Sequence, residues 1–311
     1  MNPAFSVVVF TTVAGAAQGL VVALACAQLF GIAVDPALLD AGLLVAAAML
    51  TVGLGASFFH LGRPERAWRS VLMWRTSWLS REVIVLPAFM GVVALWWALL
   101  QVDAPRLLTD VLVPLAALAL AALLWFCTGM IYACLRFIEE WAHPLTPLNF
   151  TLLGLSSGLL LTCALCGIAE DDSLLRAVGP AALVATLAAW LGRMLALRRN
   201  ASIRHRSTLQ SATGIAAPAL VQKSMGMSAG AFNTREFFHR ASQAALKRIR
   251  LGFVVFGYAL PALLAAWGLA GDGPWPWFVA VAVQAPALVA DRWFFFAQAK
   301  HPQNLYYQVV S

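Results

Sequence analysis

Eight long apolar segments alternate with short polar segments along this chain. A helix that crosses a bilayer needs about 20 mainly apolar residues, and each segment reaches that order of length. None alternates apolar and polar residues with a period of two, as the strands of a membrane β-barrel do. The pattern therefore predicts an all-α integral membrane protein, a bundle of eight transmembrane helices in a single polytopic domain over residues 1–311. The predicted spans are Val7–Phe30, Leu38–Phe59, Val83–Gln101, Leu107–Leu135, Leu148–Ile168, Leu174–Leu197, Leu251–Ala270 and Trp277–Ala297.

The overall composition agrees with this pattern. Apolar residues make up 61% of the chain, charged residues only 11%, and the mean hydropathy is +0.80. A soluble globular domain carries about 25% charged residues. These values exclude an ordinary soluble enzyme, a disordered protein and a nucleic-acid-binding protein, although the isoelectric point is near 9.6.

The charges are distributed unevenly between the two ends of the predicted bundle. With eight spans, both termini share one side with the three long connections, Leu61–Arg81, Arg136–Pro147 and Arg198–Arg250. That side holds 19 of the 21 lysine and arginine residues, whereas eight of the 14 acidic residues lie on the side of the short turns. Cytoplasmic loops of membrane proteins carry an excess of Lys and Arg. We therefore expect both termini and the three long connections to be cytoplasmic.

The cysteine and histidine residues of this chain are poorly placed to bind a redox metal. All five cysteines fall within apolar spans, and the Cys163–Cys166 pair has no second pair to complete a zinc or iron–sulfur site. All five histidines lie at the cytoplasmic side, so no pair faces another inside the bundle as a bis-histidine haem requires. No Asp or Glu lies clearly at the middle of a span, which disfavours an ion transporter. We expect no haem or metal bound by this chain.

Two glycine pairs predict close contacts between helices. Gly15 and Gly19 in the first span, and Gly154 and Gly158 in the fifth, each match the GxxxG pattern. Small residues at this spacing allow helix backbones to approach closely within a membrane.

Candidate chemistry is concentrated between the second and third spans. His60 lies at the end of span two, Arg63 and Arg81 lie in the connection, and Ser80 is the expected N-cap of a helix with Glu82 in its first turn. One interpretation is an interfacial segment whose Arg and Trp residues only anchor the helices at headgroup depth. The other is a quinone pocket, in which an imidazole donates to a quinone carbonyl and a carboxylate exchanges the accompanying proton.

Three stretches carry a resemblance to a known family. HLG-x-P-x-R-A over His60–Ala67, S-x-E over Ser80–Glu82, and DRWFFFAQAKHPQNLYY over Asp291–Tyr307 resemble the membrane anchor subunits of the dimethyl sulfoxide reductase family. The tail and the intact HLGRPERAW are most similar to the anchors of cytoplasmic sulfite-oxidising enzymes in that family.

The resemblance implies a subunit of a bacterial inner-membrane oxidoreductase that is not catalytic on its own. Its partners would be a molybdopterin catalytic subunit and a four-cluster iron–sulfur subunit. The family's quinone-associated histidine and glutamate fall on His60 and Glu82, and Arg63 or Arg81 would tune the charge of the bound quinone, either ubiquinone or menaquinone. Together with the predicted topology, the resemblance favours quinone reduction coupled to cytoplasmic sulfite oxidation.

Other functions stay open at this point. The anchor could oxidise quinol for a dimethyl sulfoxide reductase-type complex, or it could be a purely structural tether. A transporter or another non-redox membrane protein would use HLGRPERAW only to hold its helices at the interface.

The connection over residues 198–250 is a long basic loop. It carries ten Lys or Arg residues against one acid, Glu236. Such a loop contributes to topology and contacts anionic lipid, and it could also dock on an acidic face of the iron–sulfur subunit. The docking residues we expect are Arg235, Arg240, Lys247 and Arg248, on an interfacial helix before span seven.

Overall fold

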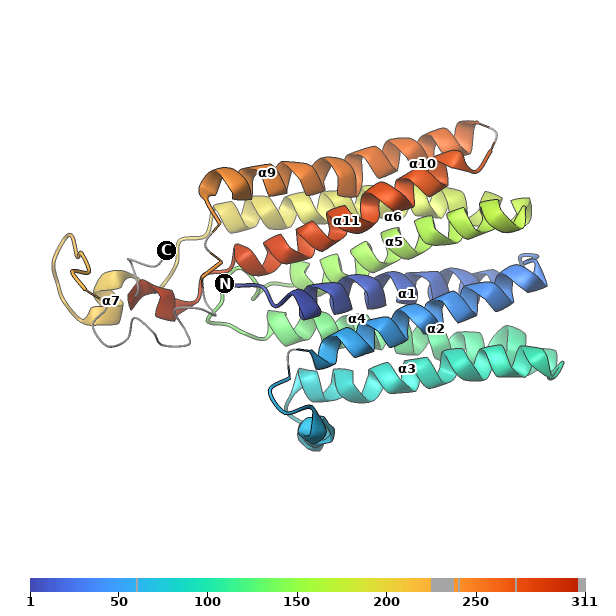
Figure 1. Ribbon diagram of the computed structural model, residues 1–311, viewed down its shortest axis with the longest axis horizontal. Helices are drawn as coiled ribbons and strands as arrows, with labels where there is room; N and C mark the ends of the chain where they lie inside the picture. Colours follow the sequence, from blue (N-terminus) through green and yellow to red (C-terminus); the bar gives the residue numbers. More distant parts are fainter. Residues whose placement is uncertain (60, 225–237, 240, 272, 307–311) are drawn as a thin grey trace.

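A computed structural model shows a long helical bundle, and it confirms the predicted all-α fold (Figure 1). It describes residues 1–59, 61–224, 238–239, 241–271 and 273–306. Within these ranges there are no strands, and eight helices are long and apolar enough to cross a membrane. The spans are α1 (Phe5–Leu29), α2 (Pro36–Phe58), α3 (Trp78–Gln101), η2 with α4 (Leu107–Ala133), α5 (Leu145–Ala169), α6 (Asp172–Ala201), α9 to α10 (Gln243–Ala270) and α11 (Trp275–Ala297).

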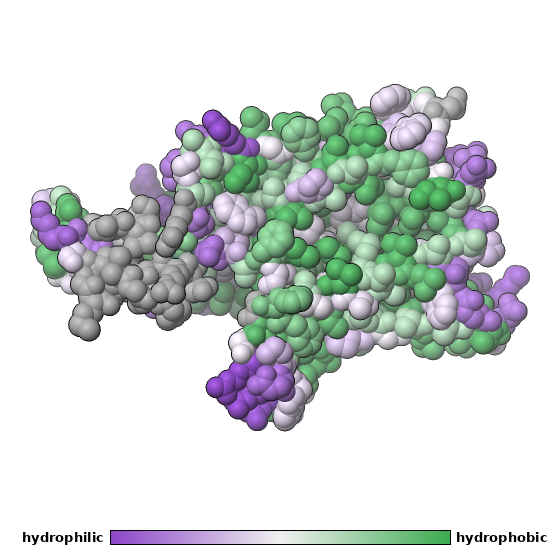
Figure 2. Space-filling view, in the orientation of Figure 1, coloured by the Kyte–Doolittle hydropathy of each residue, from purple (hydrophilic) through white to green (hydrophobic). Residues whose placement is uncertain are grey.

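Three short helices lie outside these spans. They are η1 (Pro64–Met73), α7 (Leu209–Thr213) and η5 (Pro302–Tyr306). Met1 and these three short helices lie at one end of the bundle, which we call the loop end (Figure 1). The described connections at the opposite end are short turns. Figure 2 shows a broad apolar belt between more polar ends, as a membrane protein requires.

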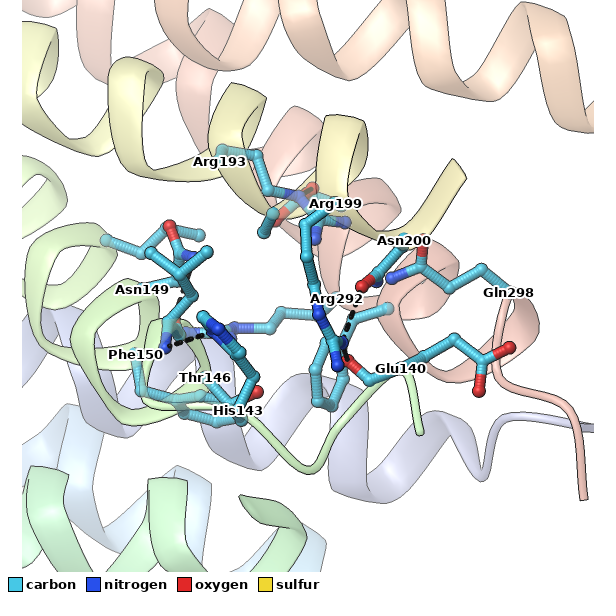
Figure 3. A pocket seen from close by; sticks show the side chains of 15 residues that line it. Glu140, His143, Thr146, Asn149, Phe150, Arg193, Arg199, Asn200, Arg292 and Gln298 are labelled. Atoms are coloured by element: carbon cyan, nitrogen blue, oxygen red, sulfur yellow. Dashed lines mark hydrogen bonds and ion pairs between the residues drawn. The ribbon is translucent and has the colours of Figure 1, made fainter. Parts of the chain in front are cut away.

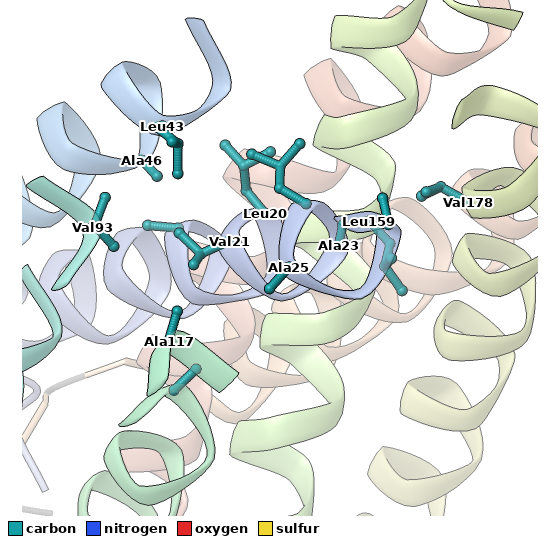
Figure 4. Close-up of a cluster of buried hydrophobic side chains, with 14 of the residues drawn as sticks. Leu20, Val21, Ala23, Ala25, Leu43, Ala46, Val93, Ala117, Leu159 and Val178 are labelled. Atoms are coloured by element: carbon teal, nitrogen blue, oxygen red, sulfur yellow. The ribbon is translucent and has the colours of Figure 1, made fainter. Parts of the chain in front are cut away.

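The first helix lies at the centre of the bundle. Helix α1 packs against α2, α4, α5 and α11, and it is the most buried of the eight spans. Its apolar side chains form a core with those of its neighbours (Figure 4). Leu20 and Val21 of α1 are fully buried there, as are Leu43 of α2 and Ala117 of α4.

The close packing predicted at the two glycine pairs is confirmed, and the structure shows that the pairs meet each other where α1 crosses α5. A Cβ atom added to Gly19 would lie 2.1 Å from the carbonyl oxygen of Gly154, and one added to Gly158 would lie 2.3 Å from Gly19 Cα. No side chain larger than hydrogen fits at this distance, so the glycines set the separation of the two central helices.

The seventh span contains a π-helical segment, η4 (Val255–Ala259), between α9 and α10. Pro261 follows it and has no backbone N–H to donate to the carbonyl four residues earlier, that of Gly257. The Gly257 oxygen instead accepts a hydrogen bond from Gln284 Nε2 at 3.2 Å. A side chain of α11 therefore satisfies a backbone group that lipid could not.

Candidate functional site

The connection between α2 and α3 is an exposed amphipathic segment. Trp68 and Trp74 of this connection are 64% and 52% exposed, and the guanidiniums of Arg69 and Arg75 lie 5.6 and 5.4 Å from their ring centroids. Exposed aromatic residues next to cations are typical of the membrane interface. His60, the first predicted quinone ligand, lies outside the described residues.

The predicted N-cap of α3 is wrong. Ser77, not Ser80, caps the helix: its Oγ accepts the backbone N–H of Ser80 at 3.3 Å, and the helix begins at Trp78. Both serines are chemically suited to capping, and the sequence alone did not separate them. Glu82 therefore lies in the second turn of α3 rather than in its first turn.

Glu82 is buried between α3 and α4. Glu82 is only 6% exposed, and the Thr128 hydroxyl of α4 donates a hydrogen bond to Glu82 Oε1. Among the described residues no cationic side chain pairs with this carboxylate. A buried acid without an opposite charge is costly inside a membrane protein and is usually kept for function.

The two predicted arginines do not approach Glu82. Arg81 turns toward the connection, where it stacks on Trp78 at 4.1 Å and donates to the carbonyl oxygen of Trp74 at 2.9 Å. Arg63 is exposed at the start of η1, and its side chain makes no hydrogen bond or ion pair with the described residues. Of the three predicted quinone residues that the structure describes, only Glu82 lies in the bundle interior.

Thr128 links Glu82 to a small pocket between α1, α4 and α5. Besides Thr128, the pocket is lined by side chains that include Thr11, Gln18 and Trp125. The Gln18 Oε1 and Trp125 Nε1 atoms are buried and have no hydrogen-bond partner among the described residues. Glu82 itself is not among the lining residues of this pocket.

The predicted docking residues fall into two groups. Arg235 and Arg240 lie outside the described residues. Lys247 and Arg248 are exposed near the start of α9, at the loop end. Lys247 and Arg248 belong to the seventh span itself, because α9 continues through η4 into α10, whereas most of the expected interfacial helix falls on residues outside those that the structure describes.

Sequence reasoning missed a buried ionic cluster within the spans. Arg193 Nε of α6 lies 2.6 Å from Asp291 Oδ1 of α11, and both residues are at most 3% exposed. Tyr258 donates to Asp291 Oδ2 at 3.3 Å. Arg292 is 4% exposed, and its guanidinium lies 3.7 Å from the ring centroid of Phe150. The signal was present, since Asp291 and Arg292 interrupt an apolar run, but the charge count assigned them to the cytoplasmic side.

No group of three metal-binding side chains is found in the part of the chain that the structure describes. Cys163 and Cys166 are both buried in α5, where they pack as small apolar residues.

Comparison with known proteins places the chain in a family. The family model described as "DMSO reductase anchor subunit (DmsC)" matches residues 1–232. A sulfite dehydrogenase subunit from Allochromatium vinosum is 47% identical over the whole of both chains. The anaerobic dimethyl sulfoxide reductase chain YnfH of Escherichia coli is 30% identical over 38% of this chain and 41% of its own length. The chain is therefore a multi-pass member of the family of dimethyl sulfoxide reductase anchor subunits.

Proposed function

We propose that this anchor subunit passes electrons between an iron–sulfur partner subunit and membrane quinone, and that Glu82 and His60 form the quinone site. The full-length similarity to a sulfite dehydrogenase subunit supports quinone reduction coupled to sulfite oxidation as the direction of electron flow. None of the described residues favours ubiquinone over menaquinone.

The observation that carries the proposal is the burial of Glu82. A carboxylate held by one threonine hydroxyl, with no cationic partner among the described residues, is able to release and take up a proton. It lies within two turns of the loop end, where protons can be exchanged with water. The neighbouring end of α2 exposes Phe58 and Phe59, so an apolar ring could approach this region directly from lipid.

The overall reaction balances between the partner and this chain. Oxidation of sulfite with one water gives sulfate, two protons and two electrons at the catalytic partner. Reduction of one quinone consumes two electrons and two protons. In this chain His60 would donate a hydrogen bond to a quinone carbonyl, and Glu82 would deliver a proton to a quinone oxygen and be reprotonated from the loop end.

We also propose that the loop end faces the cytoplasm at a bacterial inner membrane. Met1, η5 and the described parts of the long connections lie there, and the basic residues are concentrated in these connections (Figure 1). A molybdopterin catalytic subunit and a four-cluster iron–sulfur subunit would dock at this end. Lys247 and Arg248, together with Arg235 and Arg240, would offer positive charge to an acidic face of the iron–sulfur subunit.

Replacement of His60 by alanine tests the proposal. We expect quinone-linked turnover of the assembled complex to fall, while the partner subunits stay bound to the membrane and still reduce an artificial soluble acceptor. Full quinone-linked turnover in His60→Ala would remove His60 from the site. Release of the partners from the membrane would instead indicate that His60 serves assembly of the complex and not the quinone site.

A further inference from the structure

A second polar pocket lies at the loop end, and Glu82 is not among its lining residues. It is enclosed by α5, α6, α11 and the connection before α5 (Figure 3). We call it the arginine pocket. Its polar lining side chains include His143, Asn149, Arg193, Arg199, Arg292 and Gln298.

The arginine pocket has more positive than negative charge. It is lined by three guanidiniums and by two carboxylates, those of Asp291 and Glu140. Asp291 is already satisfied by Arg193 and Tyr258. In Figure 3 the Glu140 carboxylate points away from Arg193 and Arg292, and its Oε1 lies 3.6 Å from His205 Nε2. Arg292 is therefore a buried cation without a carboxylate of its own.

Several buried donors in the pocket have no acceptor. Arg193 Nη2, Arg292 Nε and Gln298 Nε2 are buried and make no hydrogen bond with the described residues. His143 Nδ1 accepts the backbone N–H of Leu145 at 3.2 Å, so a neutral His143 carries its proton on Nε2 and adds a further donor. An unsatisfied buried donor costs about 1–3 kcal/mol, and more when it is charged. Two buried acceptors of the pocket, Glu140 Oε2 and Asn149 Oδ1, also lack a partner among the described residues, but the donors outnumber them. This excess of donors favours an acceptor group with several oxygens.

We propose that the arginine pocket binds a phosphate-type oxyanion, either the headgroup of a membrane phospholipid or free phosphate. Guanidinium groups bind such oxygens through paired, charge-assisted hydrogen bonds. The depth suits a headgroup, because Arg292 lies between one and two helical turns from the end of α11 at Ala297. Basic pockets between transmembrane helices are typical headgroup sites on the cytoplasmic side. The site does not depend on the quinone proposal.

Inorganic phosphate is the first probe, applied to the purified full-length chain in mild detergent. Thermal unfolding is followed as phosphate replaces chloride at constant ionic strength. A ligand that binds the folded state raises Tm in a saturable way. We expect a rise of at least about 2 °C for the wild type if free phosphate is the ligand.

Adjacent arginines provide the matched variants. Arg199 lines the pocket, whereas Arg198 is exposed on the same turn of α6. Arg198→Gln should keep the phosphate response and Arg199→Gln should lose it. If Arg199→Gln does not fold, Gln298→Ala removes one unpartnered donor without changing the charge and should weaken the response.

A lipid arm separates the two sources of phosphate. The same variants are reconstituted in nanodiscs of phosphatidylglycerol, extracted, and analysed for retained lipid by native mass spectrometry. A headgroup site is supported if the wild type and Arg198→Gln each retain one phosphatidylglycerol and Arg199→Gln retains none. A saturable Tm rise without retained lipid supports free phosphate. The absence of both, or equal responses in Arg198→Gln and Arg199→Gln, overturns the proposal.

Discussion

Two regions of this bundle bury charged side chains near the same end, and they treat those charges differently. Between α3 and α4, Glu82 is held by one hydroxyl and has no cationic partner among the described residues. Between α6 and α11, Asp291 is bound by both Arg193 and Tyr258, with Arg292 as its neighbour in the chain. The first region has one lone acid, and in the second region the acid is fixed by an arginine and a tyrosine.

The difference indicates what each region can do. An acid that lacks a fixed counter-charge can change its protonation during turnover with little disturbance of its neighbours, as proton delivery to quinone requires. An acid fixed by an arginine and a tyrosine holds three helices in place, and breaking one contact leaves an uncompensated charge. We therefore assign proton exchange to Glu82 and stability to Asp291.

Replacement of Glu82 by glutamine should have the largest effect on activity. Glutamine keeps the size and still accepts from Thr128, but it cannot transfer a proton. We expect quinone-linked turnover of the assembled complex to fall by about 10²-fold or more, with Tm almost unchanged. The control is Glu65→Gln, because Glu65 is exposed on η1 and 67% of its side chain is accessible. Equal turnover in Glu82→Gln and wild type would contradict the assignment.

Replacement of Asp291 by asparagine should show the opposite pattern. The buried guanidinium of Arg193 loses its counter-charge, and removing one partner of a buried pair typically costs about 3–5 kcal/mol. Thermal or denaturant unfolding in detergent measures the loss. Asp172→Asn, at an exposed position in the first turn of α6, should cost at most about 1 kcal/mol. Near-equal stability of these two variants would mean that the network does not hold the helices.

Disruption of the glycine contact between α1 and α5 should give a smaller loss of stability. Gly158→Ala places a methyl group 2.3 Å from Gly19 Cα, so α1 and α5 must separate, at a cost of about 1–3 kcal/mol. Gly91→Ala on α3 has nothing within 4 Å of its new methyl group and should be neutral or slightly stabilising. Unfolding midpoints of the two variants test this, and a stable Gly158→Ala would show that the helices adjust.

His143 should give the smallest effect, and only at acidic pH. Burial, and secondarily the charge of Arg199, lowers the pKa of His143 below its usual 6.5 in the folded chain. Below about pH 6.5 the unfolded chain therefore binds more protons than the folded chain, so stability falls as the pH drops below that value. In His143→Gln this part of the pH dependence should be absent. Parallel pH profiles of wild type and variant would contradict the prediction.

The fold could be predicted almost completely from the sequence, because a membrane span needs a long apolar run, which can be recognised without tertiary information. The burial of Glu82 was harder to foresee, since Ser77 and Ser80 were equally suitable caps and the choice shifts Glu82 by nearly a turn. The Arg193–Asp291 pair could not be predicted by spacing, because the two residues are 98 positions apart and meet only because α6 and α11 both pack against the seventh span.

Photolabelling of the assembled complex with an azidoquinone, followed by peptide mapping, tests the central claim most directly. We predict labels within residues 58–82 or on α4 near Thr128, and loss of these labels in His60→Ala. Labels confined to α5, α6 and α11 around Arg193 and Arg292 would contradict the account, and would move quinone chemistry to the arginine pocket.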